Sequence, residues 1–257
     1  MSKARVISII NLKGGVAKSM TAINMADILC RRFEKRVLLM DNDIQANMTK
    51  FYRLYSPETE AGMSILLGGC KPEILHTSTE GIDIVTSNMG LMTATWNLTM
   101  SMAPGQHLRY KDFIDEVRGE YDYIIIDNPP TISMNIINAL VATDDVIVPV
   151  KIDEWSLDGL DIIAEQIEEA KQYNSKIRLA GCLITIYRKT DAQVNGEKWL
   201  RENSQYPVFL QKIRYSDKVD DSTFYHQGIA EYSRRSAAAI DYIRFVQEYM
   251  SISERRI

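Results

Sequence analysis

Two glycines, two lysines and a serine near the N-terminus have the spacing of a phosphate-binding loop. Residues 11–20 read N-L-K-G-G-V-A-K-S-M, between a short apolar run and a helix-like segment. Gly14 and Gly15 lack a Cβ atom, so the backbone can turn and present its N–H groups to phosphate oxygens beside the positive end of the following helix. Lys18 would reach the terminal phosphates, and the Ser19 hydroxyl would hold Mg²⁺. A glycine-rich turn with two surface lysines is the alternative. The predicted nucleotide-binding residues are Lys13, Gly14, Gly15, Val16, Ala17, Lys18, Ser19 and Met20.

Carboxylates follow two further apolar runs. Asp41 and Asp43 come directly after one run, and Asp127 ends another. Where parallel strands end, side chains point into the crevice in which such sheets bind ligands. We therefore expect Asp127 to hold Mg²⁺ through a water molecule opposite the phosphate loop. For Asp41 and Asp43, capping of a following helix is the alternative. Prolines stiffen the chain after Asp127, in a loop formed by Asn128, Pro129 and Pro130.

The elements that must position these residues alternate along the chain. Short apolar runs, several without polar alternation, are separated by longer amphipathic segments. This order predicts an α/β fold, with a mostly parallel twisted sheet and helices on both faces. The expected strands cover residues 5–10, 36–40, 82–86, 123–126, 146–150 and 178–185. The expected helices cover residues 21–32, 63–67, 91–102, 157–173 and 237–250. No repeat or linker divides the chain, so we expect one domain over residues 1–257.

The phosphate-binding loop departs from the common pattern G-x-x-x-x-G-K-[ST], because Leu12 and Ala17 stand where that pattern has glycine. The remaining K-G-G-x-x-K-S resembles the deviant Walker A motif of the ParA/MinD family of dimeric ATPases. The resemblance implies that ATP and Mg²⁺ bind here and that Lys13 crosses a dimer interface to the other subunit's nucleotide. There it would counter charge on the transferring phosphoryl group, as an arginine finger does. A methyl group at Ala17 strains the loop if this residue needs a positive φ, so we expect slow hydrolysis.

Two more stretches extend the resemblance. D-N-D-I-Q-A-N-M-T over residues 41–49 resembles the family's D-x-D-P-Q-x-N-x-T, with Ile44 in place of the proline. Y-D-Y-I-I-I-D-N-P-P over residues 121–130 resembles its Walker B strand and the second switch loop, which senses the γ-phosphate. The implied catalytic residues are Lys13, Lys18 and Asp43, of which Asp43 positions the attacking water. The implied metal site comprises Ser19, Asp127 through water and Asp41 in the outer shell.

Basic residues outnumber acidic ones by seven to four between residues 188 and 218, although the whole chain has a net charge of −4. In family members that partition plasmids or chromosomes, basic residues in this region bind the DNA backbone without reading its sequence. The resemblance thus implies non-specific binding of double-stranded DNA, and a ParB-like centromere-binding protein that stimulates hydrolysis. A solvated face of mixed charge is the alternative. The candidate DNA-binding residues are Arg188, Lys189, Arg214 and Lys218.

Composition limits the remaining classes of protein. With 257 residues, 46% of them hydrophobic, the chain can bury a full core. Cys30, Cys70 and Cys182 lie far apart without a C-x-x-C pair, which argues against a zinc knuckle, a disulfide framework and an iron–sulfur reductase of the nitrogenase-iron-protein type. No apolar run reaches the roughly 18 residues that a membrane span needs. We expect a cytoplasmic, nucleoid-associated protein without membrane contact.

The sequence therefore predicts a ParA-type ATPase that forms an ATP-bridged dimer, binds DNA and partitions plasmid, chromosomal or other mobile DNA, with hydrolysis releasing the dimer. The first expected strand begins close to Met1, so we expect no N-terminal helix-turn-helix domain. A MinD-like membrane-associated positioning ATPase and a nucleotide-binding regulatory module with little hydrolysis are the alternatives. Trp96 is interpreted as a partly buried anchor. Several methionines are interpreted as core filling rather than as an adaptable partner surface: Met63, Met89, Met92, Met100 and Met102.

Overall fold

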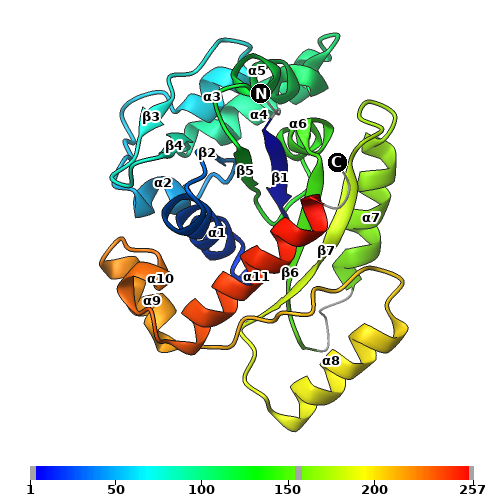
Figure 1. Cartoon of the computed structure of the whole chain (residues 1–257). Coiled ribbons are helices and arrows are strands. Elements are labelled where there is room, and N and C mark those ends of the chain that lie inside the picture. Colours follow the sequence, from blue (N-terminus) through cyan, green and yellow to red (C-terminus); the bar gives the residue numbers. More distant parts are fainter. Residues whose placement is uncertain (1–3, 154–157, 255–257) are drawn as a thin grey trace.

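A seven-stranded sheet forms the centre of the molecule (Figure 1), and the computed structural model describes residues 4–153 and 158–254. The strand order is β3-β4-β2-β5-β1-β6-β7, and neighbouring strands are parallel except β3 and β4. The strands are β1 (Arg5–Ile9), β2 (Val37–Asp41), β3 (Leu75–His76), β4 (Ile82–Val85), β5 (Tyr123–Asp127), β6 (Asp145–Lys151) and β7 (Arg178–Thr185). The central strands are buried on both faces, which explains their continuous apolar runs.

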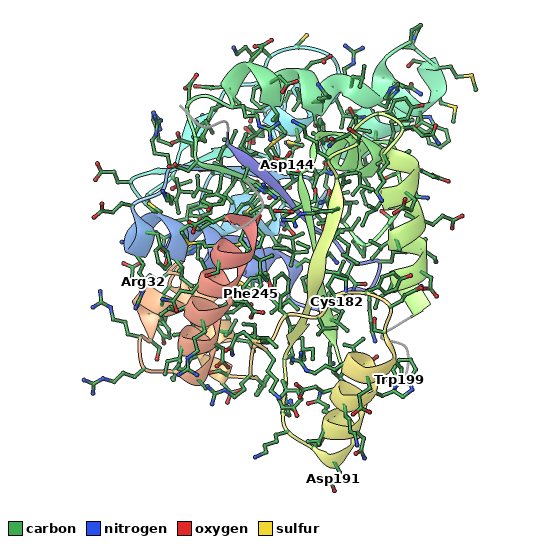
Figure 2. All side chains as sticks on the ribbon, turned by 45° about the vertical axis from the view of Figure 1, so that its right-hand side comes forward. Arg32, Asp144, Cys182, Asp191, Trp199 and Phe245 are labelled. Carbon is green, nitrogen blue, oxygen red and sulfur yellow. The ribbon has the colours of Figure 1, made fainter. Side chains whose placement is uncertain are left out.

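Helices cover both faces of this sheet (Figure 1). The helices α1 (Lys18–Phe33) and α11 (Ala237–Glu254) pack on one face, through the core that contains Ile7, Ile9 and Ile125. The other face packs against α5 (Arg109–Val117), α6 (Met134–Ala142) and α7 (Asp158–Ala170). The remaining helices are α2 (Asn47–Phe51), α3 (Gly62–Leu67), α4 (Gly90–Ser101), η1 (Gln106–Leu108), α8 (Asp191–Asn203), α9 (Asp217–Phe224) and α10 (Ile229–Tyr232). Figure 2 shows that α8, with Asp191 and Trp199, projects away from the sheet.

The predicted α/β fold with helices on both faces is confirmed. All six expected strands are present, each ending within one residue of its predicted limits. The sequence does not predict β3, because two residues on an edge strand carry no periodicity. It also starts α1 at Thr21 although the helix begins at Lys18. Seven helices are not predicted: α2, η1, α5, α6, α8, α9 and α10. Within the described residues, no helix is long and apolar enough to cross a membrane.

Most of the methionines predicted to fill the core lie at the surface instead. Met63 is fully buried, whereas the other four are at least half exposed: Met89, Met92, Met100 and Met102. Trp96, expected to be a partly buried anchor, is 64% exposed. The reason is that α4 packs inward through Leu91 and Leu98, so its other apolar residues face outward. The prediction of core filling is therefore wrong for this helix.

A buried ion cluster ties both ends of the chain to the sheet. The fully buried Asp145 carboxylate accepts hydrogen bonds from Arg5 Nε at 2.7 Å, Arg178 Nε at 2.5 Å and the Tyr249 hydroxyl at 2.8 Å. Burial alone would raise the pKa of Asp145, but these three donors outweigh it and the pKa is lowered. The cluster therefore stabilises the folded protein while Asp145 is ionised.

The variant Asp145→Asn is expected to lower the free energy of unfolding by about 3 kcal/mol at pH 7, because two arginines lose a buried counter-ion. Since the pKa of Asp145 is lowered from 3.8, its contribution is present above about pH 4 and is lost as the pH falls through the lower folded value. Urea unfolding at pH 7 and pH 3 checks this. The exposed pair of Lys111 and Asp115 supplies the control Asp115→Asn, expected to cost under ~1 kcal/mol. A variant difference as large at pH 3 as at pH 7 would contradict the prediction.

Candidate active site

The chain leaves β1 and forms an open loop before α1. Gly15 has a φ of +70°, and a Cβ atom on Gly14 or Gly15 would meet nothing within 4 Å. Asn11 closes the base of this loop: its Nδ2 donates to the Pro149 carbonyl at 2.7 Å, and its Oδ1 accepts from the Lys13 N–H at 2.9 Å. The backbone is thus held in place while its glycine side faces open space. This is the arrangement that lets a backbone approach a phosphate group.

Ala17 adopts the left-handed conformation in which a methyl group is strained. Its φ is 65° and its ψ is 35° at the N-cap of α1. Its carbonyl accepts hydrogen bonds from the Thr21 N–H at 2.9 Å and the Thr21 Oγ1 at 2.7 Å. These bonds hold the residue in a conformation that costs an L-amino acid about 1–2 kcal/mol.

Ala17→Gly is expected to raise the free energy of unfolding of the nucleotide-free protein by about 0.5–1 kcal/mol, since glycine adopts this conformation without strain. Urea unfolding monitored by circular dichroism checks the value. The matched control is Ala22→Gly in the interior of α1, where glycine should destabilise by about 1 kcal/mol or more. If both variants lost stability to the same extent, the strain at Ala17 would be refuted.

The two lysines of the loop have different surroundings. Lys18 is buried, and its Nζ donates to the Lys13 carbonyl at 3.0 Å. Burial lowers the pKa of Lys18, while Asp127 and Asp43 act in the opposite direction. Lys13 is partly exposed, and its ammonium group forms an ion pair with Asp153. Lys18 thus lines a cavity of its own chain, whereas Lys13 does not line it; the action of Lys13 across an interface stays a prediction.

The ends of β2 and β5 bring Asp41 beside Asp127, since the two residues pair in register. Asp41 is fully buried; its Oδ2 accepts from Thr49 N at 2.7 Å and Thr49 Oγ1 at 2.6 Å, and burial raises its pKa to about 6. Asp43 differs: its Oδ1 accepts from the Gln45 N–H at 2.9 Å, and the residue lines a cavity. Asp41 is therefore satisfied inside the protein, and Asp43 is the carboxylate that faces the cavity.

Asp127 has the surroundings of a residue that binds a cation through water. Its side chain is buried, and neither carboxylate oxygen accepts a hydrogen bond from the described residues. Burial and then Asp41 raise the pKa of Asp127, whereas the positive charge of Lys18 opposes the rise. A buried carboxylate without partners is destabilised unless a cation and its waters satisfy it. The described residues contain no cluster of three His, Cys, Asp or Glu ligands, so Mg²⁺ would take few ligands from the protein: Ser19 directly and Asp127 through water.

A cavity of about 600 Å³ joins the loop to the two strand ends. Six predicted nucleotide-binding residues line it: Gly14, Gly15, Ala17, Lys18, Ser19 and Met20. Asp43 and Pro130 line it too, which confirms that the three stretches meet at one place. Val16 is buried beneath, and its carbonyl accepts from Thr185 Oγ1 at 3.0 Å.

No sequence pattern predicts one wall of this cavity. Thr223 and His226, at the end of α9, line it together with Lys50 and Phe51. His226 Nδ1 forms a hydrogen bond of 2.7 Å with the Phe51 carbonyl. The centres of the His226 and Phe51 rings lie 6.1 Å apart. The aromatic rings of Phe51 and His226, beside the Lys50 side chain, have the chemistry of a wall that can bind a nucleotide base. No motif surrounds these residues, and they join the loop only through folding. The other lining residues missed are Ile23, Gln45 and Asn47.

A buried amide network connects the two strand ends. Asn42, between the two aspartates, donates from Nδ2 to Asn128 Oδ1 at 2.8 Å. Its Oδ1 accepts from the Tyr110 hydroxyl at 2.7 Å and from Asn135 Nδ2 at 3.1 Å. All four side chains are buried. The loop after β5 therefore cannot move without disturbing the segment that carries Asp43.

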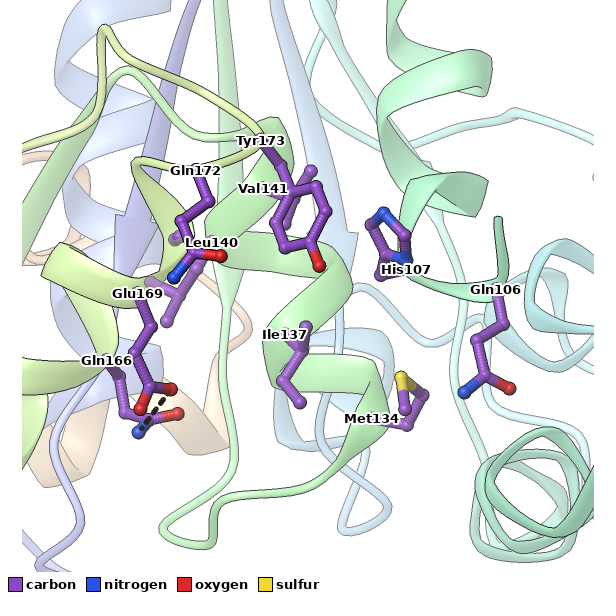
Figure 3. Close-up of a pocket in the computed structure, with 11 residues that line it drawn as sticks. Gln106, His107, Met134, Ile137, Leu140, Val141, Gln166, Glu169, Gln172 and Tyr173 are labelled. Carbon is purple, nitrogen blue, oxygen red and sulfur yellow. Dashed lines mark hydrogen bonds between the residues drawn. The ribbon is translucent and has the colours of Figure 1, made fainter. Parts of the chain in front are cut away.

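A second cavity, of about 340 Å³, lies between η1, α6 and α7 (Figure 3). The His107 and Tyr173 rings line it with their centres 4.1 Å apart. Gln166 Nε2 donates a hydrogen bond of 3.2 Å to the Glu169 carboxylate. Apolar side chains of α6 line its inner side: Met134, Ile137, Leu140 and Val141. It is lined by no lysine and no glycine. This cavity therefore lacks the groups that bind phosphate.

The candidate DNA-binding residues lie on two segments that pair side by side. Tyr187 bridges Arg214, and the Arg188 guanidinium lies 3.5 Å from the centre of the Tyr215 ring. Arg214 forms an ion pair with Asp241 at 2.8 Å, and Lys218 pairs with Asp221 at 2.9 Å. Arg188 and Lys189 are exposed and form no ion pair within the described residues. These two residues therefore carry most of the free positive charge of this surface.

The chain is similar to known proteins over nearly its whole length. A family model described as "AAA domain" matches residues 4–179, which include the loop and both aspartate-bearing strand ends. The chromosome-partitioning ATPase Soj of Thermus thermophilus is 33% identical over 253 residues, 97% of each chain. The sporulation initiation inhibitor protein Soj of Bacillus subtilis is 29% identical and covers 95% of this chain and 97% of its own. Cobyrinic acid a,c-diamide synthase from Mycobacterium smegmatis, solved with bound ATP analog and magnesium, has a TM-score of 0.83 and 26% identity, with 98% of this chain and 96% of that chain covered.

Proposed function

Because this chain belongs to the ParA/MinD family of ATPases, we propose that it binds ATP with Mg²⁺ and hydrolyses it to partition plasmid or chromosomal DNA. One observation carries the proposal: Lys18, Asp43 and Pro130, from three separate stretches, line one cavity of about 600 Å³. The similarity to two Soj proteins supports the partition role.

The chemistry follows from the residues that line the cavity. Bound Mg²⁺ supplies positive charge that offsets the phosphates. The loop N–H groups and Lys18 bind phosphate oxygens, and Ser19 and Asp127 hold the site of the cation. Asp43 orients a water molecule and takes a proton from it as the water oxygen bonds to the γ-phosphorus. The bond between that phosphorus and the β–γ bridging oxygen breaks, which releases ADP and phosphate.

The dimer is proposed to use Lys13. In the single chain its ammonium group is paired with Asp153, and Lys13 does not line the cavity. In an ATP-bridged dimer Lys13 would exchange this carboxylate for the phosphates of the other subunit's nucleotide. Two basic surfaces, each containing Arg188 and Lys189, would then act on one DNA molecule, and their linkage raises affinity through effective concentration. A ParB-like partner would stimulate hydrolysis, and the protein would work on the nucleoid in the cytoplasm as a single domain of residues 1–257.

Binding of random-sequence duplex DNA in Mg²⁺-ATP, in Mg²⁺-ADP and without nucleotide, across a salt series, tests the proposal. We expect binding only with ATP, weakening as salt rises, because neutralised phosphates release counter-ions. Lys189→Ala should weaken binding at every salt concentration, whereas Lys176→Ala, a distant exposed lysine, should not. Arg214→Ala is unsuitable, since it also leaves the buried Asp241 unpaired.

Two outcomes would overturn the proposal. DNA binding that is equally strong with ATP, with ADP and without nucleotide would show that an ATP-dependent dimer is not needed for it. ATP binding without phosphate release, even with DNA and the ParB-like partner present, would favour the nucleotide-binding regulatory module instead.

A further inference from the structure

The outer face of α4 carries an uninterrupted row of large apolar side chains. Met89, Met92, Trp96 and Met100 follow at spacings of three, four and four residues and are 50%, 55%, 64% and 58% exposed. At 100° per residue these positions fall on one side of the helix, and we call them the Met–Trp stripe. The stripe extends over about 16 Å along the helix. Exposed apolar surface of this continuity marks a site of interaction.

The composition of α4 supports the same conclusion. The helix Gly90–Ser101 has no charged residue, and its opposite face is buried through Leu91 and Leu98. A helix that is apolar on both sides is normally covered on both sides. In the described structure α4 is covered only on the side that faces α3 and the core (Figure 1). The Met–Trp stripe is therefore an uncovered half of an otherwise packed helix.

A groove of about 560 Å³ runs beside the stripe, between α3, α4 and the start of α5. Thr93 and Asn97 of α4 line it, and helical geometry places both next to the Trp96 side of the helix. On the opposite side Arg109 lines the groove, where a Cβ atom on Gly69 would fall 2.3 Å from its Nη1. The absent side chain at Gly69 thus leaves the room that the guanidinium occupies.

Arg109 has no anion in the described structure. Its buried Nε has no hydrogen-bond partner, and the guanidinium forms no ion pair within residues 4–153 and 158–254. Ser64 lines the same groove, is 3% exposed, and its Oγ also lacks a partner. Glu60, the other charged residue of the lining, does not pair with Arg109. The Ser64 Oγ is closed to solvent, whereas the guanidinium of Arg109 lines the groove and can bind a carboxylate from outside.

We propose that the Met–Trp stripe and this groove dock an acidic amphipathic helix of a protein partner. Its apolar face covers the stripe, and one of its carboxylates binds the Arg109 guanidinium in the groove. A small anion would satisfy Arg109 but leave about 16 Å of apolar helix exposed, whereas a helix satisfies both features. Methionines suit such contacts because their side chains adapt to the partner.

The docking site goes beyond the proposed ATPase function and does not depend on it. The docking site is nevertheless connected to the ATPase site. Tyr110, the residue after Arg109, donates a hydrogen bond to Asn42, which lies between the two aspartates. The test is therefore made without nucleotide, so that a failure to hydrolyse ATP leaves its result unaffected.

The test uses two synthetic 18-residue helical peptides with the same leucine face, one with glutamates and one with lysines on the polar face. Isothermal titration into the full chain is expected to show that the glutamate peptide binds at least tenfold more tightly, as expected for one desolvated charge-assisted contact. Arg109→Gln should remove this preference, whereas Lys111→Gln on the same helix should keep it. The double variant Met92→Ser, Trp96→Ser should weaken both peptides, and Trp199→Ser on α8 should weaken neither.

Three outcomes would overturn the proposal. Equal affinity for the two peptides would show that the partner need not be acidic. Unchanged binding by Arg109→Gln would show that the groove takes no part in docking. Self-association of the nucleotide-free chain that Met92→Ser, Trp96→Ser abolishes would assign the stripe to a second copy of this protein. Circular dichroism melting of each variant separates lost binding from lost folding.

Discussion

Lys18→Ala is expected to abolish detectable ATP binding. The ammonium group is buried in the cavity, between the glycine loop and the carboxylates of Asp127 and Asp43. Without it, the terminal phosphates lose two charge-assisted hydrogen bonds, which together correspond to about a 100-fold weaker affinity or more. At a concentration 100 times its dissociation constant, ATP should raise the melting temperature of the wild type by roughly 5–10 °C. The variant should show no such rise.

The nucleotide-free variant provides the decisive control. Burial lowers the pKa of Lys18, so the folded protein already disfavours this charge. The nucleotide-free variant should therefore melt at the wild-type temperature or above it, and lost binding then cannot come from unfolding. Lys176→Ala should keep the full ATP shift. An ATP shift in Lys18→Ala within twofold of the wild type would show that the phosphates bind elsewhere.

The residues whose position in the fold the sequence predicted are those that depend on a short stretch of chain, and their roles stay predictions. The glycine loop is one example: two glycines, a lysine and a serine within ten residues, between a strand and a helix, contain the turn, the donors and the charge. Asp127 is another, because an apolar strand of known length places its last residue at the sheet edge. The glycine loop and Asp127 are far apart in the sequence. The order of elements in a parallel sheet places both at the same edge of the sheet.

The rest could not be predicted because it arises from contacts between distant segments. Asn42 resembles any polar loop residue until folding brings Tyr110 and Asn135 against it. His226 joins the cavity only because α9 packs near α2. The exposure of Trp96 is a third example, since hydrophobicity alone cannot say which side of α4 faces the core. Burial of a helix on two sides is decided by its neighbours, not by its own residues.

Asp43→Asn is expected to leave ATP binding within a few-fold of the wild type and to slow phosphate release by about 10²–10⁴-fold, the usual range for a lost general base. The amide has the shape of the carboxylate and can still accept from the Gln45 N–H, so the loop geometry is kept. It cannot take the proton of the attacking water. Because Asp41 is engaged by Thr49 and lies inside the protein, it cannot replace Asp43.

The measurement is phosphate release from Mg²⁺-ATP in the presence of DNA, together with the ATP-induced rise in melting temperature as the readout of binding. Asp112→Asn, an exposed carboxylate on α5, should match the wild type in both. If Asp43→Asn lost ATP binding as well, the carboxylate would hold the nucleotide or its cation rather than the water. If it released phosphate at the wild-type rate, the reaction would need no base at this position, and the network through Asn42 would instead serve to hold the two strand ends together.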